Sequence, residues 1–284
     1  MIQINDLAFD YKSQSLFRGI EMQLMPGNIY GLLGVNGAGK STLLGLMTGL
    51  LFASSGAVRT LGRDPALREP SLLSNVFVLP EELHLPTTTG AEYVQTRAPF
   101  YPKFDRAQFD RYMAEFELPQ DKKLNTLSHG QKKKFLLAFG LSCQSALLLL
   151  DEPTNGLDIP SKAQFRRLIA EAATPERLFI IATHQVRDLG SLLDPIVILH
   201  QGRVLFHRTL EEIGARVRMT HSPSPPDSSA PGLLYSEPTV GGFWSVWQES
   251  NAGEGILDLE VLFNTLIARP DLATSVFGNE GGVA

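Results

Sequence analysis

The sequence predicts an α/β protein whose central strands are parallel. Residues 29–33, 146–150 and 177–182 are each dominated by consecutive apolar side chains rather than by alternating ones. Continuous apolarity is typical of strands buried on both faces, as in a parallel sheet covered by helices. Between these runs, apolar residues recur at helical spacing, for example in residues 161–173. We therefore expect buried strands that alternate with helices.

The stretch after the first of these strands fits the P-loop pattern of Gly, four residues, Gly, Lys and then Ser or Thr. It reads Gly34-Val35-Asn36-Gly37-Ala38-Gly39-Lys40-Ser41-Thr42 and precedes apolar positions at helical spacing. A loop between a strand and a helix N-terminus directs free backbone N–H groups and the positive end of the helix dipole at an anion. Lys40 is expected to reach the β- and γ-phosphates, and the Ser41 hydroxyl to bind Mg²⁺. The sequence therefore predicts a P-loop NTPase core.

A second group of candidate site residues follows other predicted strands. Asp151 and Glu152 end the apolar run 146–150, where two carboxylates are costly unless they serve a metal and a water. Asp151 is expected to hold Mg²⁺, mostly through water, and Glu152 to polarise the attacking water. His184 leaves its strand at the same edge of the sheet, which favours contact with the γ-phosphate. Asp158 follows in a turn at the edge of the site.

Two further features admit more than one interpretation from the residues alone. Tyr11 is either a half-buried strand aromatic or a ring that stacks on a nucleobase. Ser128 is a plausible N-cap, so the helix start around Gly130 is a candidate second anion site. The three lysines at 132–134 we interpret as a solvated helix face.

Composition limits the class of protein. The chain has 284 residues, 43% of them hydrophobic and 19% charged, with a formal net charge of −5. This charge gives no general basic field for binding nucleic acid. Cys143 is the only cysteine, which suits a reducing compartment. The N-terminus does not resemble a signal peptide, and no apolar run reaches about 18 residues. We expect a cytoplasmic protein, with any membrane part supplied by a separate subunit.

The order of predicted elements suggests several parts. Residues 1–213 are expected to form one domain with an antiparallel N-terminal β part and a helical insert at about 87–142. The aromatic face of the helix at 106–116 is expected to be core. A hairpin is predicted around Gln201 and Gly202, followed by a helix at 210–218. Residues 214–232 are rich in Pro and Ser and are interpreted as a linker, and 233–284 as a small α+β appendage.

These motifs, in this order and at these intervals, resemble those of an ATP-binding cassette (ABC) ATPase over roughly residues 1–212. The most similar type is the ATP-binding subunit of a bacterial exporter whose membrane subunit is a separate chain. The segment from Tyr101 to Asp105 and the helix around Leu259 to Phe263 are similar to that branch.

The resemblance implies a role for each matching position. Ser128, Gly130 and Gln131 match the signature motif, which completes the ATP site of a partner protomer, so that ATP lies between two chains arranged head to tail. Tyr11 matches the ring that stacks on adenine, so the resemblance favours the stacking role over that of a half-buried strand aromatic. Asp158 matches the loop that crosses the dimer interface. The implied nucleotide-binding residues are Tyr11, Gly34, Asn36, Gly37, Ala38, Gly39, Lys40, Ser41, Thr42, Glu81, Ser128, Gly130, Gln131 and Asp158.

The catalytic residues implied by the resemblance are Lys40, Glu152 and His184, and the Mg²⁺ ligands are Ser41, Asp151 and Glu81. Two positions depart from the family pattern. His129 stands where Gly is most usual in the signature, and Glu81 stands where a glutamine usually binds Mg²⁺ and water. Glu81 adds a negative charge, which either tightens the metal or repels the γ-phosphate. We expect both positions to be variants that preserve activity.

The resulting functional prediction is an ATPase subunit that drives export through a separate membrane permease. Its expected partners are a second copy or a homologous cassette and the permease, with no nucleic acid, and its expected place is the cytoplasmic face of the membrane. Two alternatives stay open. One is a soluble cassette ATPase that acts on ribosomes or DNA, and the other is a nucleotide-gated regulatory module with weak hydrolysis.

Overall fold

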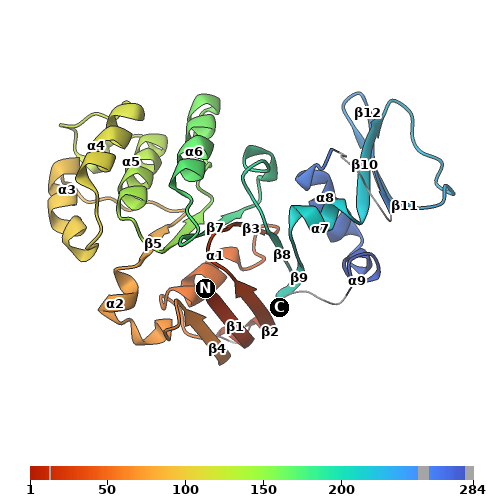
Figure 1. The fold of residues 1–284 in the computed structure, drawn as a ribbon, viewed down its shortest axis with the longest axis horizontal. Helices are drawn as coiled ribbons and strands as arrows, with labels where there is room; N and C mark the ends of the chain where they lie inside the picture. Colours follow the sequence, from red (N-terminus) through yellow and green to blue (C-terminus); the bar gives the residue numbers. More distant parts are fainter. Residues whose placement is uncertain (13, 249–255, 279–284) are drawn as a thin grey trace.

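The computed structural model describes residues 1–12, 14–248 and 256–278, and a six-stranded sheet lies at its centre (Figure 1). The strand order is β5-β6-β7-β3-β8-β9, with β9 antiparallel to β8 and the other neighbours parallel. This mixed sheet confirms the predicted α/β class. Its strands are β3 (Ile29–Leu33), β5 (Val76–Leu79), β6 (Leu147–Asp151), β7 (Leu178–Thr183), β8 (Ile196–His200) and β9 (Arg203–Arg208).

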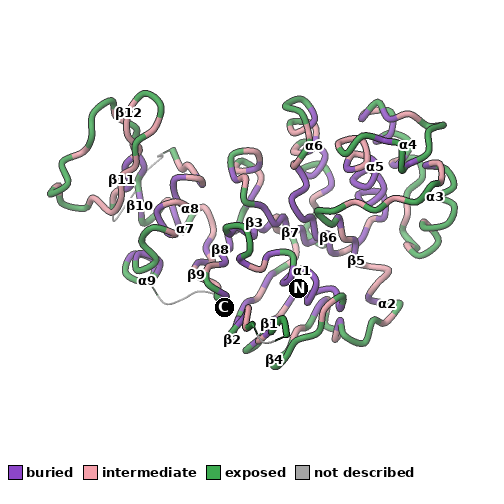
Figure 2. The backbone as a smooth tube through the Cα atoms, turned by 180° about the vertical axis from the view of Figure 1, so that it is seen from behind, coloured by how far each residue is buried: buried purple, intermediate pink, exposed green. Residues whose placement is uncertain are grey.

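Strand β6 shows why its sequence is apolar at consecutive positions. All of its residues are buried. Leu147 and Leu149 belong to one apolar cluster, whereas Leu148 and Leu150 belong to another. Because side chains alternate along a strand, the two clusters lie on opposite faces of the sheet. The strand therefore delivers Asp151 and Glu152 from a rigid, fully covered position, as the buried tube in Figure 2 illustrates.

The N-terminal part forms a separate antiparallel sheet, as predicted. Its order is β2-β1-β4, and the first helix packs between this sheet and the central one. Two short helical segments then lead to β5. The elements are β1 (Ile2–Tyr11), β2 (Gln14–Leu24), α1 (Lys40–Met47), β4 (Ser55–Thr60), η1 (Pro65–Leu67) and α2 (Pro70–Leu73). Helix α1 is thus held between two sheets, directly behind the predicted P-loop.

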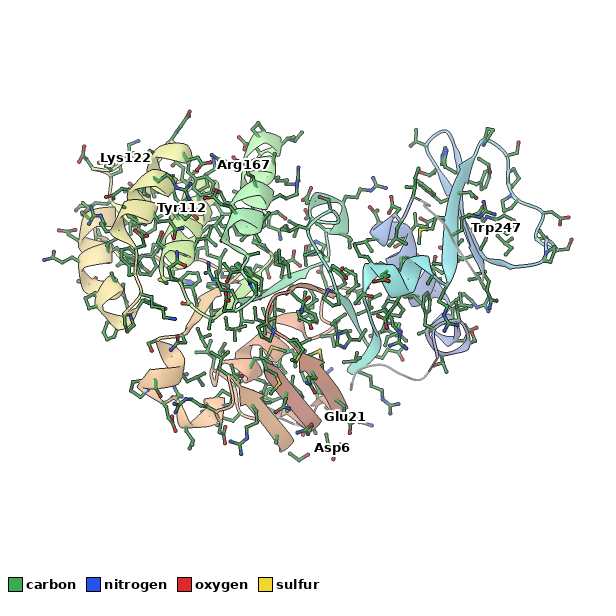
Figure 3. All side chains as sticks on the ribbon, viewed as in Figure 1. Asp6, Glu21, Tyr112, Lys122, Arg167 and Trp247 are labelled. Atoms are coloured by element: carbon green, nitrogen blue, oxygen red, sulfur yellow. The ribbon has the colours of Figure 1, made fainter. Side chains whose placement is uncertain are left out.

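The predicted helical insert lies between β5 and β6 at one end of the molecule (Figure 1). Its aromatic side chains pack on one another, and Tyr112 is fully buried while Lys122 extends outward (Figure 3). The aromatic face was therefore correctly predicted as core. The elements are α3 (Gly90–Arg97), η2 (Ala98–Phe100), α4 (Arg106–Glu115), η3 (Leu124–Thr126) and α5 (His129–Ser142), followed after β6 by α6 (Ile159–Ala172) and after β7 by η4 (Val186–Asp188).

The chain after β9 differs from the prediction at one point. The helix expected at 210–218 ends at Gly214, and residues 217–222 of the expected linker form β10, which pairs with β12. Burial of Val217 and Met219 in the core explains this strand, because alternate residues face the apolar cluster. The elements are α7 (Leu210–Gly214), β10 (Val217–Ser222), β11 (Leu233–Thr239), β12 (Gly242–Gln248), α8 (Leu259–Ala268) and α9 (Asp271–Ser275).

These C-terminal elements are attached to the rest of the chain by specific contacts. A guanidinium N–H of Arg208 donates to the carbonyl oxygen of Phe277 at 2.9 Å, and the rings of Phe206 and Phe277 meet edge to face. Arg187 of η4 forms an ion pair with Glu260 of α8. Residues 249–255 and 279–284 of the expected appendage lie outside the described residues. Within the described part of the chain, no helix has both the length and the apolarity needed to cross a membrane.

Candidate functional site

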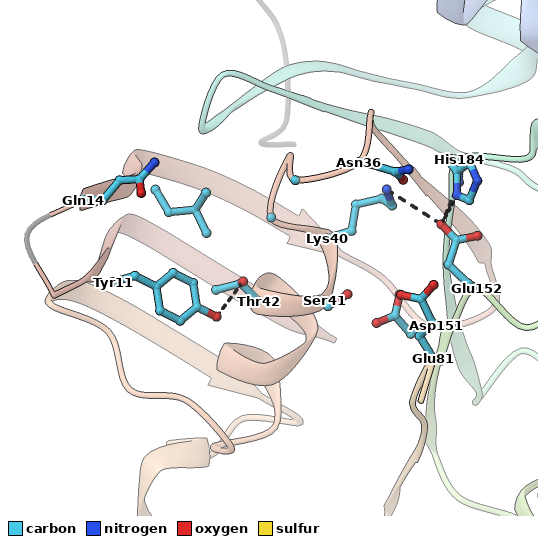
Figure 4. A pocket seen from close by; sticks show the side chains of 13 residues that line it. Tyr11, Gln14, Asn36, Lys40, Ser41, Thr42, Glu81, Asp151, Glu152 and His184 are labelled. Carbon is cyan, nitrogen blue, oxygen red and sulfur yellow. Dashed lines mark hydrogen bonds and ion pairs between the residues drawn. The ribbon is translucent and has the colours of Figure 1, made fainter. Parts of the chain in front are cut away.

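A pocket of about 450 Å³ opens where β3, β6 and β7 end (Figure 4). This is the edge of a parallel sheet at which ligands usually bind. The structure brings most of the predicted site residues together in it. The lining residues are Tyr11, Gln14, Leu16, Asn36, Gly37, Gly39, Lys40, Ser41, Thr42, Glu81, Asp151, Glu152 and His184.

The loop from Gly34 to Gly39 leaves the start of helix α1 open. Gly39 is the N-cap residue, its φ is 99°, and no side chain caps the helix. A Cβ atom on Gly39 would lie 2.6 Å from the ring of Phe17, so both conformation and packing require glycine there. Around Gly37 there is open space instead. The first N–H groups of the helix therefore face a region where an anion can approach.

Lys40 is the cation of this loop. Its ammonium group donates to the carbonyl oxygen of Gly34 at 2.8 Å and lies 3.8 Å from a carboxylate oxygen of Glu152. Burial lowers the pKa of Lys40, and the charges of Glu152, Asp151 and Glu81 oppose this effect. Lys40 thus stands between the backbone of the loop and the carboxylates across the pocket.

Glu152 receives hydrogen bonds from several directions. Its carboxylate accepts from the Thr183 hydroxyl at 3.0 Å and from the backbone N–H of His184 at 3.0 Å. The Nδ1 atom of His184 lies 2.6 Å from the same carboxylate. Glu152 has a φ of +44°, a left-handed conformation that costs a non-glycine residue about 1–3 kcal/mol. In this conformation, the carboxylate lies within hydrogen-bond distance of the donors at the end of β7.

Asp151 and Glu81 form an acidic corner beside Ser41, whose hydroxyl points toward them in Figure 4. One carboxylate oxygen of Asp151 is buried without a hydrogen-bond partner. Burial raises the pKa of Asp151, as do the charges of Glu81 and Glu152, while a hydrogen bond from Ser41 opposes them. A buried oxygen without a partner is costly, so this corner suits a cation.

The ring of Tyr11 borders the pocket on the side away from the carboxylates. It is 51% exposed, and its hydroxyl lies 3.1 Å from the hydroxyl of Thr42. Phe9 packs edge to face against it at 4.8 Å between ring centres. One face of an aromatic ring is thereby held at the mouth of the pocket, where a flat base can stack on it.

Several known proteins are similar in sequence to this chain. A family model described as "ABC transporter" matches residues 17–155. The ABC transporter ATP-binding protein YtrB of Bacillus subtilis (strain 168) is 29% identical over 215 residues, which are 75% of this chain and 73% of YtrB. The cobalt import ATP-binding protein CbiO of Salmonella typhimurium is 30% identical over 225 residues, which are 76% of this chain and 83% of CbiO.

This chain belongs to the family of ABC transporter ATP-binding proteins. A solved structure described as the ATP binding subunit of an ABC transporter agrees, with a TM-score of 0.69, 26% identity and coverage of 75% of this chain and 91% of the other. Members of the family bind and hydrolyse ATP, so the chain is an ABC ATPase.

The ABC ATPase family binds ATP, typically with Mg²⁺. The acidic corner fits that ion, because Asp151 offers an oxygen without a partner and Ser41 adds a hydroxyl. No group of three or more His, Cys, Asp or Glu side chains in the described residues can hold a metal ion alone. Mg²⁺ usually combines one or two carboxylates with water and substrate phosphates, which agrees with this incomplete ligand set.

Some predicted residues of the ABC ATPase do not line the pocket. Gly34 and Ala38 lie in the loop but not on its open face, and a Cβ on Gly34 would be 2.9 Å from the carbonyl oxygen of Leu199. Ser128, Gly130 and Gln131 begin helix α5, where Ser128 is the N-cap as predicted. Asp158 is the N-cap of α6 and accepts from the Ser161 N–H at 3.0 Å. Thus Ser128, Gly130, Gln131 and Asp158 do not line the pocket of their own chain.

Sequence reasoning missed other residues at the site. Gln14 and Leu16 line the pocket from β2, and the hydroxyl of Thr183 donates to the carboxylate of Glu152. The prediction that the three lysines at 132–134 form a solvated face is wrong for Lys133, which is 1% exposed and donates to the backbone carbonyl of Glu152. Helical spacing gave the missing signal, because the buried residues Leu136 and Leu137 follow Lys133 by three and four positions.

Proposed function

We propose that this ABC ATPase hydrolyses ATP in the pocket described above and drives transport by a separate membrane subunit, in the direction of export. The observation that carries the hydrolytic part is the placement of Glu152. Its side chain is 4% exposed, and its carboxylate accepts hydrogen bonds from Thr183 and His184 and lies opposite Lys40. Such a fixed carboxylate beside a phosphate-binding loop suits a group that orients water for attack.

The P-loop and Tyr11 would hold the nucleotide. Tyr11 would stack on adenine, and the backbone N–H groups of residues 36–42 would bind phosphate oxygens. Lys40 would exchange its carbonyl contacts for the β- and γ-phosphates. Ser41, Asp151 and Glu81 would hold Mg²⁺, which supplies positive charge against the phosphate oxygens.

Catalysis would then depend on two groups. Glu152 would accept a hydrogen bond from the attacking water and so orient it toward the γ-phosphate. His184 would contact the γ-phosphate and keep Glu152 in place through its backbone N–H. The protein forms no covalent bond to the phosphate in this scheme, because phosphoryl transfer depends mainly on positioning and charge neutralisation.

A second chain would complete the site. Ser128, Gly130, Gln131 and Asp158 do not line the pocket of their own chain, and Ser128 is exposed. In the proposed arrangement these residues close over the nucleotide of a second copy or of a homologous cassette. ATP binding would close the dimer, and hydrolysis would open it again.

The membrane subunit would dock between the central sheet and the helical insert. A groove of about 960 Å³ lies there, lined by apolar residues that include Leu50 and Phe100, exposed by 59% and 67%. Large exposed apolar side chains in a groove are typical of a protein contact. Phe100→Glu should abolish co-sedimentation with membranes that contain the permease. Val240→Glu also replaces an exposed apolar side chain by glutamate, at a fully exposed residue outside the groove, and should preserve it.

The domain organisation and the place of action are part of this proposal. Residues 1–213 would form the ATPase cassette with its helical subdomain at about 87–142, and the chain after it would be an accessory unit. The cassette would work at the cytoplasmic face of the membrane. Export rests on the segment from Tyr101 to Asp105, while a relative such as CbiO is named as an importer. Uptake and efflux assays in vesicles of known orientation would decide the direction.

The direct test of the hydrolytic role is Glu152→Gln. We expect turnover to fall by about 10²- to 10⁴-fold, as for loss of a general base, while MgATP still binds. Glu176→Gln makes the same chemical change at an exposed residue and should leave turnover unchanged. Full turnover by Glu152→Gln would remove Glu152 from this role.

A regulatory module with weak hydrolysis remains a second candidate, because Glu81 brings a further carboxylate to the metal corner. The negative charge of Glu81 would repel the negatively charged γ-phosphate and slow hydrolysis. Under this alternative, Glu81→Gln raises turnover well above that of the natural chain. Under the main proposal, the natural chain is already an active ATPase and Glu81→Gln lowers or preserves its rate.

A further inference from the structure

Lys133 connects helix α5 to the site in an unexpected way. It is one of the largest fully buried side chains, and its ammonium group donates to the backbone carbonyl oxygen of Glu152. Its neighbours Lys132 and Lys134 are only half-buried. A buried ammonium group is costly unless it is paired, so its position beside the proposed catalytic residue calls for an explanation.

The backbone of Glu152 explains what this contact does. Its φ of +44° is unfavourable for a glutamate, so surrounding contacts must hold it. The N–H of Glu152 donates to the carbonyl of Ala182 at 2.8 Å. Its carbonyl accepts from the N–H of Asn155 at 3.3 Å, a long bond, and from Lys133. Lys133 is therefore the charged donor that fixes this side of the peptide.

The carboxylates around the pocket also favour a charged ammonium group on Lys133. Burial lowers the pKa of Lys133 to about 8, and the charges of Glu81, Glu152 and Asp151 oppose that effect. The same three carboxylates act on Lys40. The same three carboxylates thus attract two buried ammonium groups, one from α1 and one from α5. Among these carboxylates, Glu81 has the largest effect on the pKa of Lys133.

We propose that Lys133 is a positioning residue for ATP hydrolysis. Its ammonium group fixes the main chain of Glu152, so that the carboxylate stays on the donors of Thr183 and His184 and faces the nucleotide pocket. Because Lys133 lies in the helix that starts at Ser128, this contact also joins the signature end of α5 to the hydrolytic residue of the same chain. The proposal rests on the proposed role of Glu152.

The test is a double-mutant cycle in single-turnover hydrolysis with the full chain. Lys133→Met should lower the hydrolysis rate by about 100-fold, the cost of a misplaced catalytic group, and should change the dissociation constant for MgATP by less than about threefold. Lys132→Met, the same change one residue away, should alter neither quantity. In the Glu152→Gln background, Lys133→Met should slow hydrolysis by less than about twofold, because the group it positions is already gone.

An equal loss from Lys133→Met in both backgrounds would overturn the proposal, and so would a rate within about twofold of the natural chain. If Lys133→Met does not fold, the same cycle with Lys133→Gln applies, with the same two outcomes, because the shorter amide withdraws from the carbonyl. Failure here is distinct from failure of the proposed function, which would appear as full turnover by Glu152→Gln alone.

Discussion

Two helices of the cassette begin in opposite ways. Helix α1 starts at Gly39 without a side-chain cap, inside the pocket. Helix α5 starts at Ser128 with a complete capping box. The Ser128 hydroxyl accepts from the backbone N–H of Gln131 at 3.2 Å, and the side-chain Oε1 of Gln131 accepts from the backbone N–H of Ser128 at 3.0 Å. Each helix N-terminus carries unsatisfied donors that need an acceptor.

The difference shows how each end can be used. The open end of α1 leaves its donors to an anion that the same chain binds, whereas α5 satisfies its own donors while its start is exposed. In the proposed sandwich, each ATP lies between the pocket of one chain and the start of α5 of the other. The start of α5 therefore contacts a nucleotide only when a second chain binds one. Substitutions at the two helix starts should therefore have different effects on hydrolysis, ATP binding and stability.

The largest effect should come from blocking the capped end. Ser128→Arg puts a long, charged side chain at the start of α5. We expect turnover to fall by about 10²- to 10³-fold, which is typical when an enzyme loses a hydrogen-bond donor that stabilises charge in the transition state. Each chain should still bind ATP in its own pocket. Ser228→Arg, in the exposed segment between β10 and β11, is the control and should hydrolyse ATP normally.

A mixture of two inactive variants tests whether the ends act on different chains. A heterodimer of Ser128→Arg and Glu152→Gln chains has one site in which both the pocket and the signature are intact. We expect the mixture to recover a substantial part of the natural activity. A mixture as inactive as its components would show that Ser128 and Glu152 of one chain serve the same nucleotide site.

A smaller effect is expected on the pocket side from Tyr11→Ala. Loss of stacking should weaken ATP binding by about 1–3 kcal/mol, with little change in turnover at saturating ATP. Tyr11→Phe keeps the ring and loses only the contact with Thr42, so its affinity should stay close to that of the natural chain. Equilibrium binding of a fluorescent ATP analogue measures both, and equal losses would mean that the hydroxyl matters rather than the ring.

The smallest effect should come from removing the cap itself. Ser128→Ala deletes the hydroxyl that accepts from Gln131 and should cost about 1 kcal/mol of unfolding free energy. Ser128→Thr retains a capping hydroxyl and should cost less. Thermal unfolding should show a decrease of roughly 2–4 °C for the alanine variant, and no decrease would mean that the capping box contributes little to stability.

The sequence predicted those parts whose local pattern matches their surroundings. The apolar run of β6 and the cap at Ser128 depend on neighbouring residues alone, and both are where the sequence placed them. Lys133 was misjudged because a run of three lysines suggests solvent, while its burial depends on the carbonyl of Glu152, which comes from a distant element. Local charge cannot reveal a partner that only the tertiary fold supplies.

The chain after β9 teaches the same lesson. Residues 217–222 follow a helix and precede a Pro-rich segment, so they suggested the end of a helix and a linker. They form a strand because β12, more than twenty residues later, offers a pairing edge for the full length from Val217 to Ser222. The alternation of Val217 and Met219 with polar residues was the available signal.

Sedimentation of the Glu152→Gln chain with and without MgATP tests whether two chains enclose the nucleotide. We expect a monomer without nucleotide and a dimer with MgATP, because two pockets and two signature ends then close over two nucleotides without hydrolysis to reopen them. Adding Ser128→Arg to the same chain should abolish the dimer. A Glu152→Gln chain that binds MgATP and remains a monomer would contradict the sandwich.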